Sequence, residues 1–374
     1  MPDTAQPPFR ADHVGSLLRP PALHEARAKA AAGAITRAEL RAIEDRAIRE
    51  VVAFQEAIGL PAVTDGEFRR TLWHVDFLSG FDGIEATQAS FSVPFRGETG
   101  ETANTPSVLH VKDKLRRRKP IAVADFAYLR SVAKHTPKLC IPAPTTLHYR
   151  AGRKAVSETA YPDIEEFWAD FIRAYREEID DLVAAGCTYL QFDDVSFAYF
   201  CDREIREQVR RAGEDPDRLP GQYAGIINKI IAGRPPSLRV TMHTCRGNHQ
   251  SMWRASGGYE PIAEAVFGTA AVDGFFLEFD SDRAGGFEPL RFVPKGKKIV
   301  LGLVTTKTPE VESKDLLKRR IEAAAKFVPL EDLCLSPQCG FASSHLGNRI
   351  TPEVERRKLE RILEVATEVW GTAF

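Results

Sequence analysis

The sequence predicts an α/β fold of the (β/α)8 TIM-barrel type, formed by a single domain over residues 1–374. Short apolar runs alternate with amphipathic helical segments, which implies a parallel sheet. The runs are almost continuously apolar, as is typical of strands covered on both faces. They number eight, which favours a closed barrel over the alternative of a large open sheet. No Gly-x-Gly-x-x-Gly motif follows the first run, which counts against a dinucleotide-binding fold.

Each strand is expected where an apolar run leads into polar residues or a turn. The first predicted strand and its loop cover residues 9–18, and the later strands cover residues 61–65, 139–143, 188–192, 238–242, 274–277, 298–304 and 333–336.

The helices between the strands are marked by signals at their ends. Thr36 and Glu39 have the spacing of a capping box, and Gly59 is placed to end the same helix. Asp163 and Ser313 are placed to begin later helices. The predicted helices comprise a short one from residue 20 and segments near 36–58, 125–134, 163–185, 202–212, 219–232, 259–267, 313–327 and 352–370.

The alternation is interrupted after the second strand. Polar stretches, glycines and scattered aromatic residues predict an insertion over residues 74–137, built as a hairpin or lid with a helix near its end. The basic run 112–119 within it is expected to be a solvated face. The alternative is a docking point for an acidic substrate tail.

Composition excludes several classes of protein. The net charge of −1 gives no basis for a nucleic-acid or anionic-membrane partner. No apolar run approaches the roughly 20 residues that span a bilayer, and the first residues lack signal-peptide features. We therefore expect a cytoplasmic protein with reduced cysteines that acts on small molecules. Its oligomeric state is left open.

Soft metal ligands stand at the ends of three later strands. His243 and Cys245 are two residues apart, so they leave the fifth strand on the same face. Glu278 ends the sixth strand and Cys339 follows the eighth. In a parallel barrel these strand ends share one rim, where the catalytic groups of such barrels lie. A buried structural histidine beside an inert cysteine would explain the first pair but not the later ligands.

One nitrogen, two sulfurs and one oxygen form a zinc-type ligand set. We therefore predict Zn²⁺ bound by His243, Cys245, Glu278 and Cys339. Two thiolates offset the zinc charge, which weakens activation of water but leaves a bound substrate thiol electron-rich. Glu278 is the hardest ligand and the natural one for a sulfur substrate to displace. The set favours activation of a thiol nucleophile over metal-assisted hydrolysis.

Further polar residues end the first, second and fourth strands: His13, Ser16, Asp65, Glu67, Asp193 and Asp194. Glu67 and Asp193 are suited to bind a second metal, to act as acid and base, or to hold an ammonium group. Because the zinc position favours a thiol, an aminothiol substrate is the simplest interpretation. The structural alternatives are a helix cap for Asp193 or Asp194 and an ion pair of Glu67 with Arg69 or Arg70.

These motifs resemble the catalytic domain of the cobalamin-independent methionine synthase family over about residues 10–370. The matching stretches are His243-Thr244-Cys245, Glu278, Cys339-Gly340, Gly15-Ser16, Asp65-Gly66-Glu67 and Gln191-Phe192-Asp193-Asp194. The resemblance implies methyl transfer from a methylated tetrahydrofolate to the zinc-bound thiolate of homocysteine. It also implies an ammonium site at Glu67 and Asp193, a carboxylate site at Ser16, and the four zinc ligands given above.

The sequence departs from the family pattern in three places. The second, N-terminal barrel of the full-length enzymes is absent from it. The proton-donating histidine after strand seven is replaced by Thr305-Thr306-Lys307-Thr308-Pro309-Glu310. The aromatic residue that packs on the pterin has no clear counterpart, although His148 or Tyr149 could substitute.

A folate amine leaves poorly unless it is protonated, so the missing histidine needs a replacement. The candidate catalytic residues are His13 and Asp193, with Asp12 and His74 as further candidates for the proton donor.

The predicted reaction is methyl transfer to a zinc-activated thiol, that of homocysteine, from 5-methyltetrahydrofolate or a simpler donor. A related alternative is opening of an epoxide by coenzyme M, but this sulfonate without an amine would require Arg or Lys in place of Glu67 and Asp193. A zinc hydrolase or lyase and a structural or metal-buffering zinc protein are the alternatives from other classes.

Overall fold

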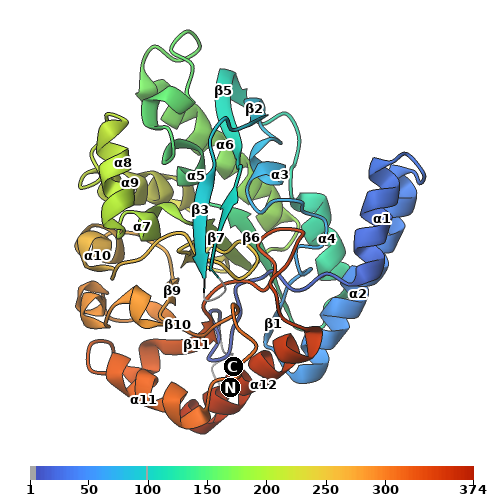
Figure 1. The fold of residues 1–374 in the computed structure, drawn as a ribbon, viewed down its shortest axis with the longest axis vertical. Helices are drawn as coiled ribbons and strands as arrows, with labels where there is room; N and C mark the ends of the chain where they lie inside the picture. Colours follow the sequence, from blue (N-terminus) through green and yellow to red (C-terminus); the bar gives the residue numbers. More distant parts are fainter. Residues whose placement is uncertain (1–5, 98–99) are drawn as a thin grey trace.

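The computed structural model describes residues 6–97 and 100–374. Its centre is a curled sheet of seven parallel strands in the order β1-β6-β7-β8-β9-β10-β11, with helices around the outside (Figure 1). This architecture confirms the predicted α/β fold class. The strands of the sheet are β1 (Ala62–Val63), β6 (Thr136–Pro142), β7 (Tyr189–Asp194), β8 (Arg239–Thr244), β9 (Gly274–Glu278), β10 (Lys298–Val304) and β11 (Leu333–Pro337).

The predicted first strand, expected with its loop within residues 9–18, is reduced in the structure to a single bridge residue. Ala11 alone forms a parallel bridge, with Leu335 of β11. The Asp12 carboxylate accepts hydrogen bonds from the backbone N–H groups of Phe9 (3.3 Å) and His13 (2.7 Å). Because a local side chain takes these donors, they are not available to a neighbouring strand. The segment holds the eighth position of the barrel without becoming a regular strand.

On its other side, this segment forms hydrogen bonds with the loop that follows β1. The Thr64 hydroxyl donates to the Gly15 carbonyl oxygen at 2.6 Å. The backbone N–H of Leu17 donates to the Gly66 carbonyl oxygen at 3.2 Å. These contacts bring the loop that follows Ala11 next to the loop that follows β1.

The helices follow their predicted ranges closely. In α2 the Thr36 hydroxyl accepts from the Glu39 N–H, the Glu39 carboxylate accepts from the Thr36 N–H, and Gly59 ends the helix in the left-handed conformation. The helices are α1 (Pro21–Ala31), α2 (Arg37–Ile58), α3 (Val75–Leu78), α4 (Val123–Val132), α5 (Thr145–His148), α6 (Ile164–Ala184), α7 (Ser196–Tyr199), α8 (Arg203–Arg211), α9 (Leu219–Ile231), α10 (Glu260–Phe267), α11 (Lys314–Ala324) and α12 (Pro352–Trp370). No helix among the described residues has the length and apolar character needed to cross a membrane.

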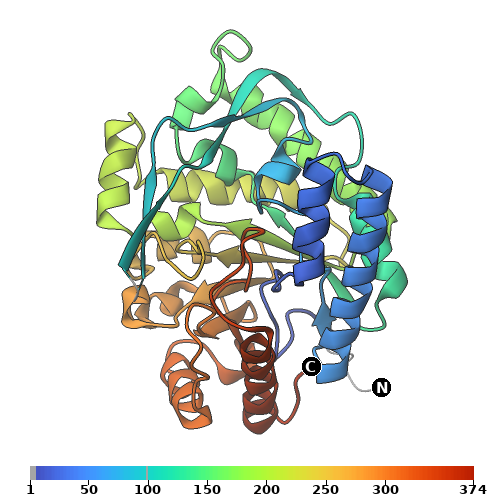
Figure 2. The ribbon, with the colours of Figure 1, turned by 45° about the vertical axis from the view of Figure 1, so that its right-hand side comes forward.

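The segment between β1 and β6 contains α3, α4 and two antiparallel strand pairs. β2 (Asp82–Gln88) pairs with β5 (Ser107–Arg116), and β3 (Val93–Gly97) pairs with β4 (Gly100–Asn104). These strands lie in front of the central sheet in Figure 1 and arch over one side of the molecule in Figure 2. Arg96 of β3 and Trp253, in the loop after β8, exchange two backbone hydrogen bonds of 2.7 Å. The hairpin is therefore tied to the rim at the carboxyl ends of the strands.

The basic run 112–119 lies along β5 and just beyond it, and four of its cations, Lys112, Lys114, Arg117 and Arg118, are paired with carboxylates of the protein. Lys112 pairs with Glu85, and Lys114 pairs with Glu166 at 2.8 Å. Arg117 binds the buried carboxylate of Glu178 at 2.6 Å. These ion pairs give the run a structural role at the surface.

Candidate active site

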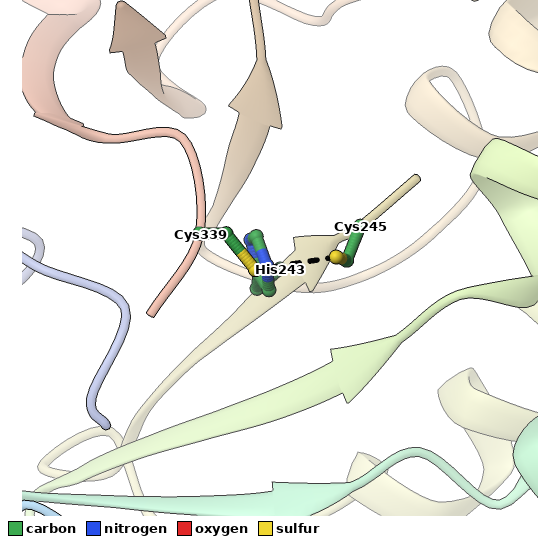
Figure 3. A group of neighbouring side chains, drawn as sticks. All are labelled: His243, Cys245 and Cys339. Carbon is green, nitrogen blue, oxygen red and sulfur yellow. Dashed lines mark hydrogen bonds between the residues drawn. The ribbon is translucent and has the colours of Figure 1, made fainter. Parts of the chain in front are cut away.

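Three of the four predicted metal ligands meet at the carboxyl end of β8 (Figure 3). One ligand atom from each of His243, Cys245 and Cys339 lies within 4.8 Å of the other two. The two sulfur atoms are 3.3 Å apart, and all three residues are buried. His243 lies on β8, Cys245 follows this strand directly, and Cys339 follows β11.

The two thiols are electrostatically unequal. The hydrogen bond between their sulfurs lowers the pKa of Cys339 well below its ordinary value and raises that of Cys245. The backbone N–H of Gly247 also donates to the Cys245 sulfur at 3.2 Å. The pair therefore favours a state with one proton between the two sulfurs and the negative charge at Cys339. The Cys245 sulfur has the Gly247 N–H as a further hydrogen-bond donor.

His243 has no hydrogen-bond partner within residues 6–97 and 100–374. Neither ring nitrogen forms a hydrogen bond, although the side chain is buried. Buried polar atoms without partners are uncommon in native proteins, and an imidazole beside two thiols within bonding reach of one point matches a zinc ligand set. The residues at the end of β8 and after β11 therefore fit a metal ion.

Glu278 lies at the end of β9, but its carboxylate belongs to a different group of contacts. Its oxygens accept hydrogen bonds from the Arg246 backbone N–H (2.9 Å) and the Arg283 guanidinium (2.5 Å), and the Lys307 ammonium is 3.7 Å away. Burial raises the pKa of Glu278, but these cations outweigh it and lower the pKa to about 2. The expected fourth ligand thus stands apart from the other three, because cations from two other loops hold it.

The cavity beside the three ligands also receives the predicted substrate-binding residues. We call it the active-site cavity, and its walls include Ser16, Glu67, Asp193, His243, Cys245 and Cys339. The ends of several strands therefore contribute to one site, as expected for a barrel of parallel strands.

Glu67 is held in a backbone conformation that is uncommon for a residue with a side chain. Its φ is 60°, a strained value that is often found at functional sites. Its N–H donates to the Asp65 carboxylate at 2.9 Å, and its carbonyl oxygen accepts from Arg19 at 2.7 Å. Burial raises the pKa of Glu67 to about 7, although Arg70 opposes this shift through an ion pair of 3.2 Å. The ion pair with Arg70 that the sequence left open is therefore present.

Asp193 and Asp194 have different surroundings although they are adjacent. Asp193 is paired with His243 across β7 and β8, and the Gln191 amide donates to its carboxylate at 2.7 Å. Burial raises its pKa. Asp194 instead accepts from the Ser196 hydroxyl and the Phe197 N–H at the start of α7. The helix-cap alternative therefore describes Asp194, and Asp193 faces the cavity.

Ser16 lies against Gly340, the residue after Cys339. A Cβ atom at Gly340 would fall 1.9 Å from the Ser16 hydroxyl oxygen, so glycine is required for this approach. The Ser16 hydroxyl accepts from the Ala342 N–H at 3.3 Å. Ser16 thus fixes the loop that carries Cys339 while its own side chain faces the cavity.

His13 lies outside the walls of the active-site cavity. Its Nε2 is 3.3 Å from the Ala62 carbonyl oxygen. Burial, reinforced by the ammonium of Lys138, lowers its pKa to about 4. The ring is therefore neutral at pH 7 and packs in the barrel interior, beside the buried ion pair between Asp12 and Lys138.

The aromatic wall of the cavity was not predicted from the sequence, although His74 was named as a candidate proton donor. Trp73 and His74 lie with ring centroids 4.7 Å apart, and Phe95 of β3 lies 5.3 Å from His249. Burial, with Arg150, lowers the pKa of His74 to about 3. These residues come from the insertion and a loop, where no repeat or motif marks them.

His148 and Tyr149, the expected pterin partners, are outside the walls of this cavity. His148 instead forms a hydrogen bond with the Tyr223 hydroxyl at 2.7 Å. Tyr149 packs edge-on against Tyr199, with ring centroids 5.7 Å apart. Both side chains therefore belong to the packing behind the site.

Comparison with known proteins gives the relatives of the chain. The family model of the cobalamin-independent synthase catalytic domain matches residues 9–367. The uncharacterised protein YxjH of Bacillus subtilis is 47% identical over 97% of this chain and 95% of its own length. The methionine synthase of Pyrococcus abyssi is 25% identical over 89% of this chain and 86% of its own. The crystal structure of a Listeria monocytogenes protein, named "putative vitamin-B12 independent methionine synthase", superposes with a TM-score of 0.79 at 38% identity and covers 98% of this chain and 99% of its own.

Proposed function

Because the chain belongs to the cobalamin-independent methionine synthase family, a family of methyltransferases, we propose that it transfers a methyl group to the thiol of homocysteine to give methionine. One observation carries the proposal: His243, Cys245 and Cys339 converge within 4.8 Å at a cavity that also contains Glu67 and Asp193. This arrangement puts soft metal ligands beside two carboxylates, which suits a substrate that has both a thiol and an amine.

The metal is proposed to be zinc, held by His243, Cys245 and Cys339. Glu278 is proposed as the fourth ligand in the absence of substrate, which requires its carboxylate to turn away from the Arg246 N–H and the Arg283 guanidinium that bind it in this structure. When bound, the ion supplies a substrate thiolate at neutral pH, because a coordinated thiol is deprotonated. A free thiol with a pKa near 8.5 is only a few per cent thiolate at pH 7.

Glu67 and Asp193 are proposed to hold the ammonium group of homocysteine. Both carboxylates are buried at the cavity, and only Glu67 has a guanidinium partner at ion-pair distance, so an ammonium would supply charge that the protein does not provide. The Ser16 hydroxyl, on the loop next to the one that carries Glu67, is proposed to donate to the substrate carboxylate. Asp193 also neighbours His243 in the strand register, and thus links the amine site to the metal ligands.

The methyl donor is proposed to be 5-methyltetrahydrofolate, placed against the aromatic wall of Trp73 and Phe95. Residues 74–137 would act as a lid, since β3 carries Phe95 and is bonded to the rim through Arg96. His13 takes no part in this scheme because it lies outside the cavity. His74 is neutral at pH 7, since its pKa is about 3, and it is not assigned as the proton donor.

The proposal is tested by incubating zinc-loaded protein with homocysteine and a panel of methyl donors, and measuring methionine by mass spectrometry. The panel contains 5-methyltetrahydrofolate, its polyglutamate form and a methylsulfonium compound. We expect methionine from at least one donor, loss of its formation after chelation, and recovery with added zinc. Formation of methionine at an unchanged rate after the metal is removed would contradict the proposal, as would the absence of methionine with every donor.

A further inference from the structure

A second cavity lies beside the active site and has no role in the proposed function. It encloses about 270 Å³, enough for several molecules of the size of water, which occupies about 30 Å³ in the liquid. We call it the Lys307 cavity. Its walls include Lys307, Arg283, Arg349, Asp280, Thr305 and Trp253.

The ammonium of Lys307 has no hydrogen-bond acceptor among the residues that the structure describes. Its side chain is 6% exposed, and Nζ forms no hydrogen bond. The Glu278 oxygen with which it pairs is 3.7 Å away, beyond hydrogen-bond distance. A lysine has three N–H donors, and leaving them unused in a buried position is unfavourable. An acceptor that occupies the cavity would satisfy them.

The walls of this cavity carry an excess of positive charge. Lys307, Arg283 and Arg349 are cationic, and Asp280 is the one carboxylate among the described wall residues. Asp280 already accepts from the Arg283 guanidinium at 3.1 Å. Arg283 keeps an unpartnered Nε and lies over the Trp253 ring, 5.1 Å from its centroid. Arg349 is exposed, so the charge is accessible from solvent.

We propose that the Lys307 cavity binds a small oxyanion, a carboxylate or phosphate group, with Lys307 as the principal donor and Arg283 and Arg349 as supporting cations. Oxyanions supply the acceptors that this set of N–H donors lacks, and hydrogen bonds between charged groups are among the stronger ones. The site does not include the predicted metal ligands His243, Cys245 and Cys339. Glu278, the fourth predicted ligand, is not among the walls, but its carboxylate pairs with Arg283 at 2.5 Å and with Lys307 at 3.7 Å, so an oxyanion would share these two cations with it.

Two sources could provide the oxyanion. One is a free anion from solution. The other is the acidic end of a ligand whose remainder fills the active-site cavity, a source that rests on the proposed function. The loop after β8 connects the two spaces, because Asn248 and His249 line the active-site cavity while Met252 and Trp253 line the Lys307 cavity.

The test measures equilibrium binding to the zinc-loaded protein by calorimetry at constant ionic strength. The probes are inorganic phosphate, glutarate and 5-methyltetrahydrofolate, each without homocysteine, and Trp253 fluorescence provides a second readout. We expect Lys307→Met to weaken binding at least roughly tenfold, as for loss of a charged hydrogen bond, and Arg349→Met to weaken it less. The exposed Lys295→Met is the matched control and should bind as the unaltered protein does.

The probes also distinguish the sources. Binding of phosphate or glutarate that depends on Lys307 would support a free anion, whereas Lys307-dependent binding of the folate alone would support an acidic tail. Failure of all probes to bind the unaltered protein, or unchanged binding in both Lys307→Met and Arg349→Met, would overturn the proposal. Arg349 is exposed, so its variant should fold even if Lys307→Met does not. No methyl transfer is measured, so the result is independent of whether the proposed function is correct.

Discussion

The sulfur atoms of Cys245 and Cys339 lie 3.3 Å apart, although 94 residues separate the two cysteines in the chain. The end of β8 and the loop after β11 bring them together, and His243 completes the group. Thiols this close in a buried site repel each other once both are ionised, unless a cation lies between them. The site is therefore suited to a metal ion that both sulfurs share.

Cys339→Ser should remove most of the zinc and most of the methyl transfer. Mutation of a residue that hydrogen-bonds to a metal ligand commonly reduces the metal affinity or the activity of a protein by about 10–100-fold. Loss of a residue that binds the metal directly should therefore reduce the rate of methyl transfer at least about 100-fold. Zinc content is measured by atomic absorption and the fold by circular dichroism. Cys187→Ser, which alters a buried thiol that bonds to the Tyr189 carbonyl oxygen, should keep its zinc. Retention of full zinc and activity in Cys339→Ser would contradict the ligand assignment.

Glu278→Gln should destabilise the zinc-free protein at neutral pH. The folded pKa of Glu278 is about 2, below its ordinary value of 4.5. The charged carboxylate therefore stabilises the fold above about pH 4.5, and this contribution is lost as the pH falls toward 2. Breaking a buried ion pair costs about 3–5 kcal/mol, measurable by urea unfolding at pH 7. Asp282→Asn in the next loop is exposed and should change stability little. Equal stability of Glu278→Gln and the unaltered protein would show that the ion pairs of Glu278 with Arg283 and Lys307 do not stabilise the fold.

Glu67→Gln should change how the KM for homocysteine depends on pH. Burial raises the pKa of Glu67 to about 7, so the carboxylate is charged mainly above that pH. In the unaltered protein the KM should therefore rise as the pH falls from 8 to 6. Glu67→Gln should raise the KM at pH 8 by about tenfold, as for a hydrogen bond to a charged group, and flatten the pH dependence. Steady-state kinetics across this range provide the test, and an unchanged profile in the variant would argue against an ammonium site at Glu67.

Phe95→Ala should weaken binding of the methyl donor but not of homocysteine. Phe95 reaches the active-site cavity from β3 of the inserted segment, whereas Asp193 is on β7 and Glu67 is in the loop after β1. Loss of one stacking partner costs about 1–3 kcal/mol, which predicts roughly a 5- to 100-fold rise in the KM for the donor. Phe91→Ala is the control, because Phe91 precedes the same strand and is 52% exposed. If both changes had the same effect on the KM for the donor, the result would contradict a contact between the proposed lid and the donor.

Glu355→Gln should stabilise the protein at high pH. Burial raises the pKa of this α12 carboxyl to about 8, against a smaller opposing effect of its hydrogen bond from the Leu18 N–H. The folded state thus binds an extra proton between about pH 4.5 and 8, so stability declines as the pH rises through that window. Glutamine keeps the acceptor without the charge, and the gain at pH 9 should be on the order of 3 kcal/mol. At pH 5 the unfolding free energies should agree. The exposed Glu322→Gln should show no such pH-dependent gain.

Much of the fold could be predicted because its signals are local. The capping box of Thr36 and Glu39 and the glycine that ends α2 act within a few residues of each other. Apolar runs marked the later strands for the same reason. A regular first strand was expected, but the structure has only a bridge there. The sequence does not reveal that the Asp12 carboxylate accepts hydrogen bonds from the backbone N–H groups of Phe9 and His13.

The site was predictable where one strand end fixes the geometry. His243 and Cys245 share a face because they are two residues apart, and Asp193 lies beside His243 because β7 and β8 are parallel neighbours. The partners of Glu278 were not predictable, because Arg283 and Lys307 come from separate loops whose paths depend on packing. Phe95 belongs to the inserted segment, and its approach to the cavity follows from a hairpin that pairs with a distant loop. Trp73 directly precedes this segment.

The most direct test of the central claim is X-ray absorption at the zinc edge, recorded on the loaded protein before and after homocysteine is added. We predict two sulfur neighbours from Cys245 and Cys339 at first, and a third sulfur with the loss of one oxygen neighbour when the thiol binds. A spectrum that does not change with homocysteine would contradict thiol activation at this site.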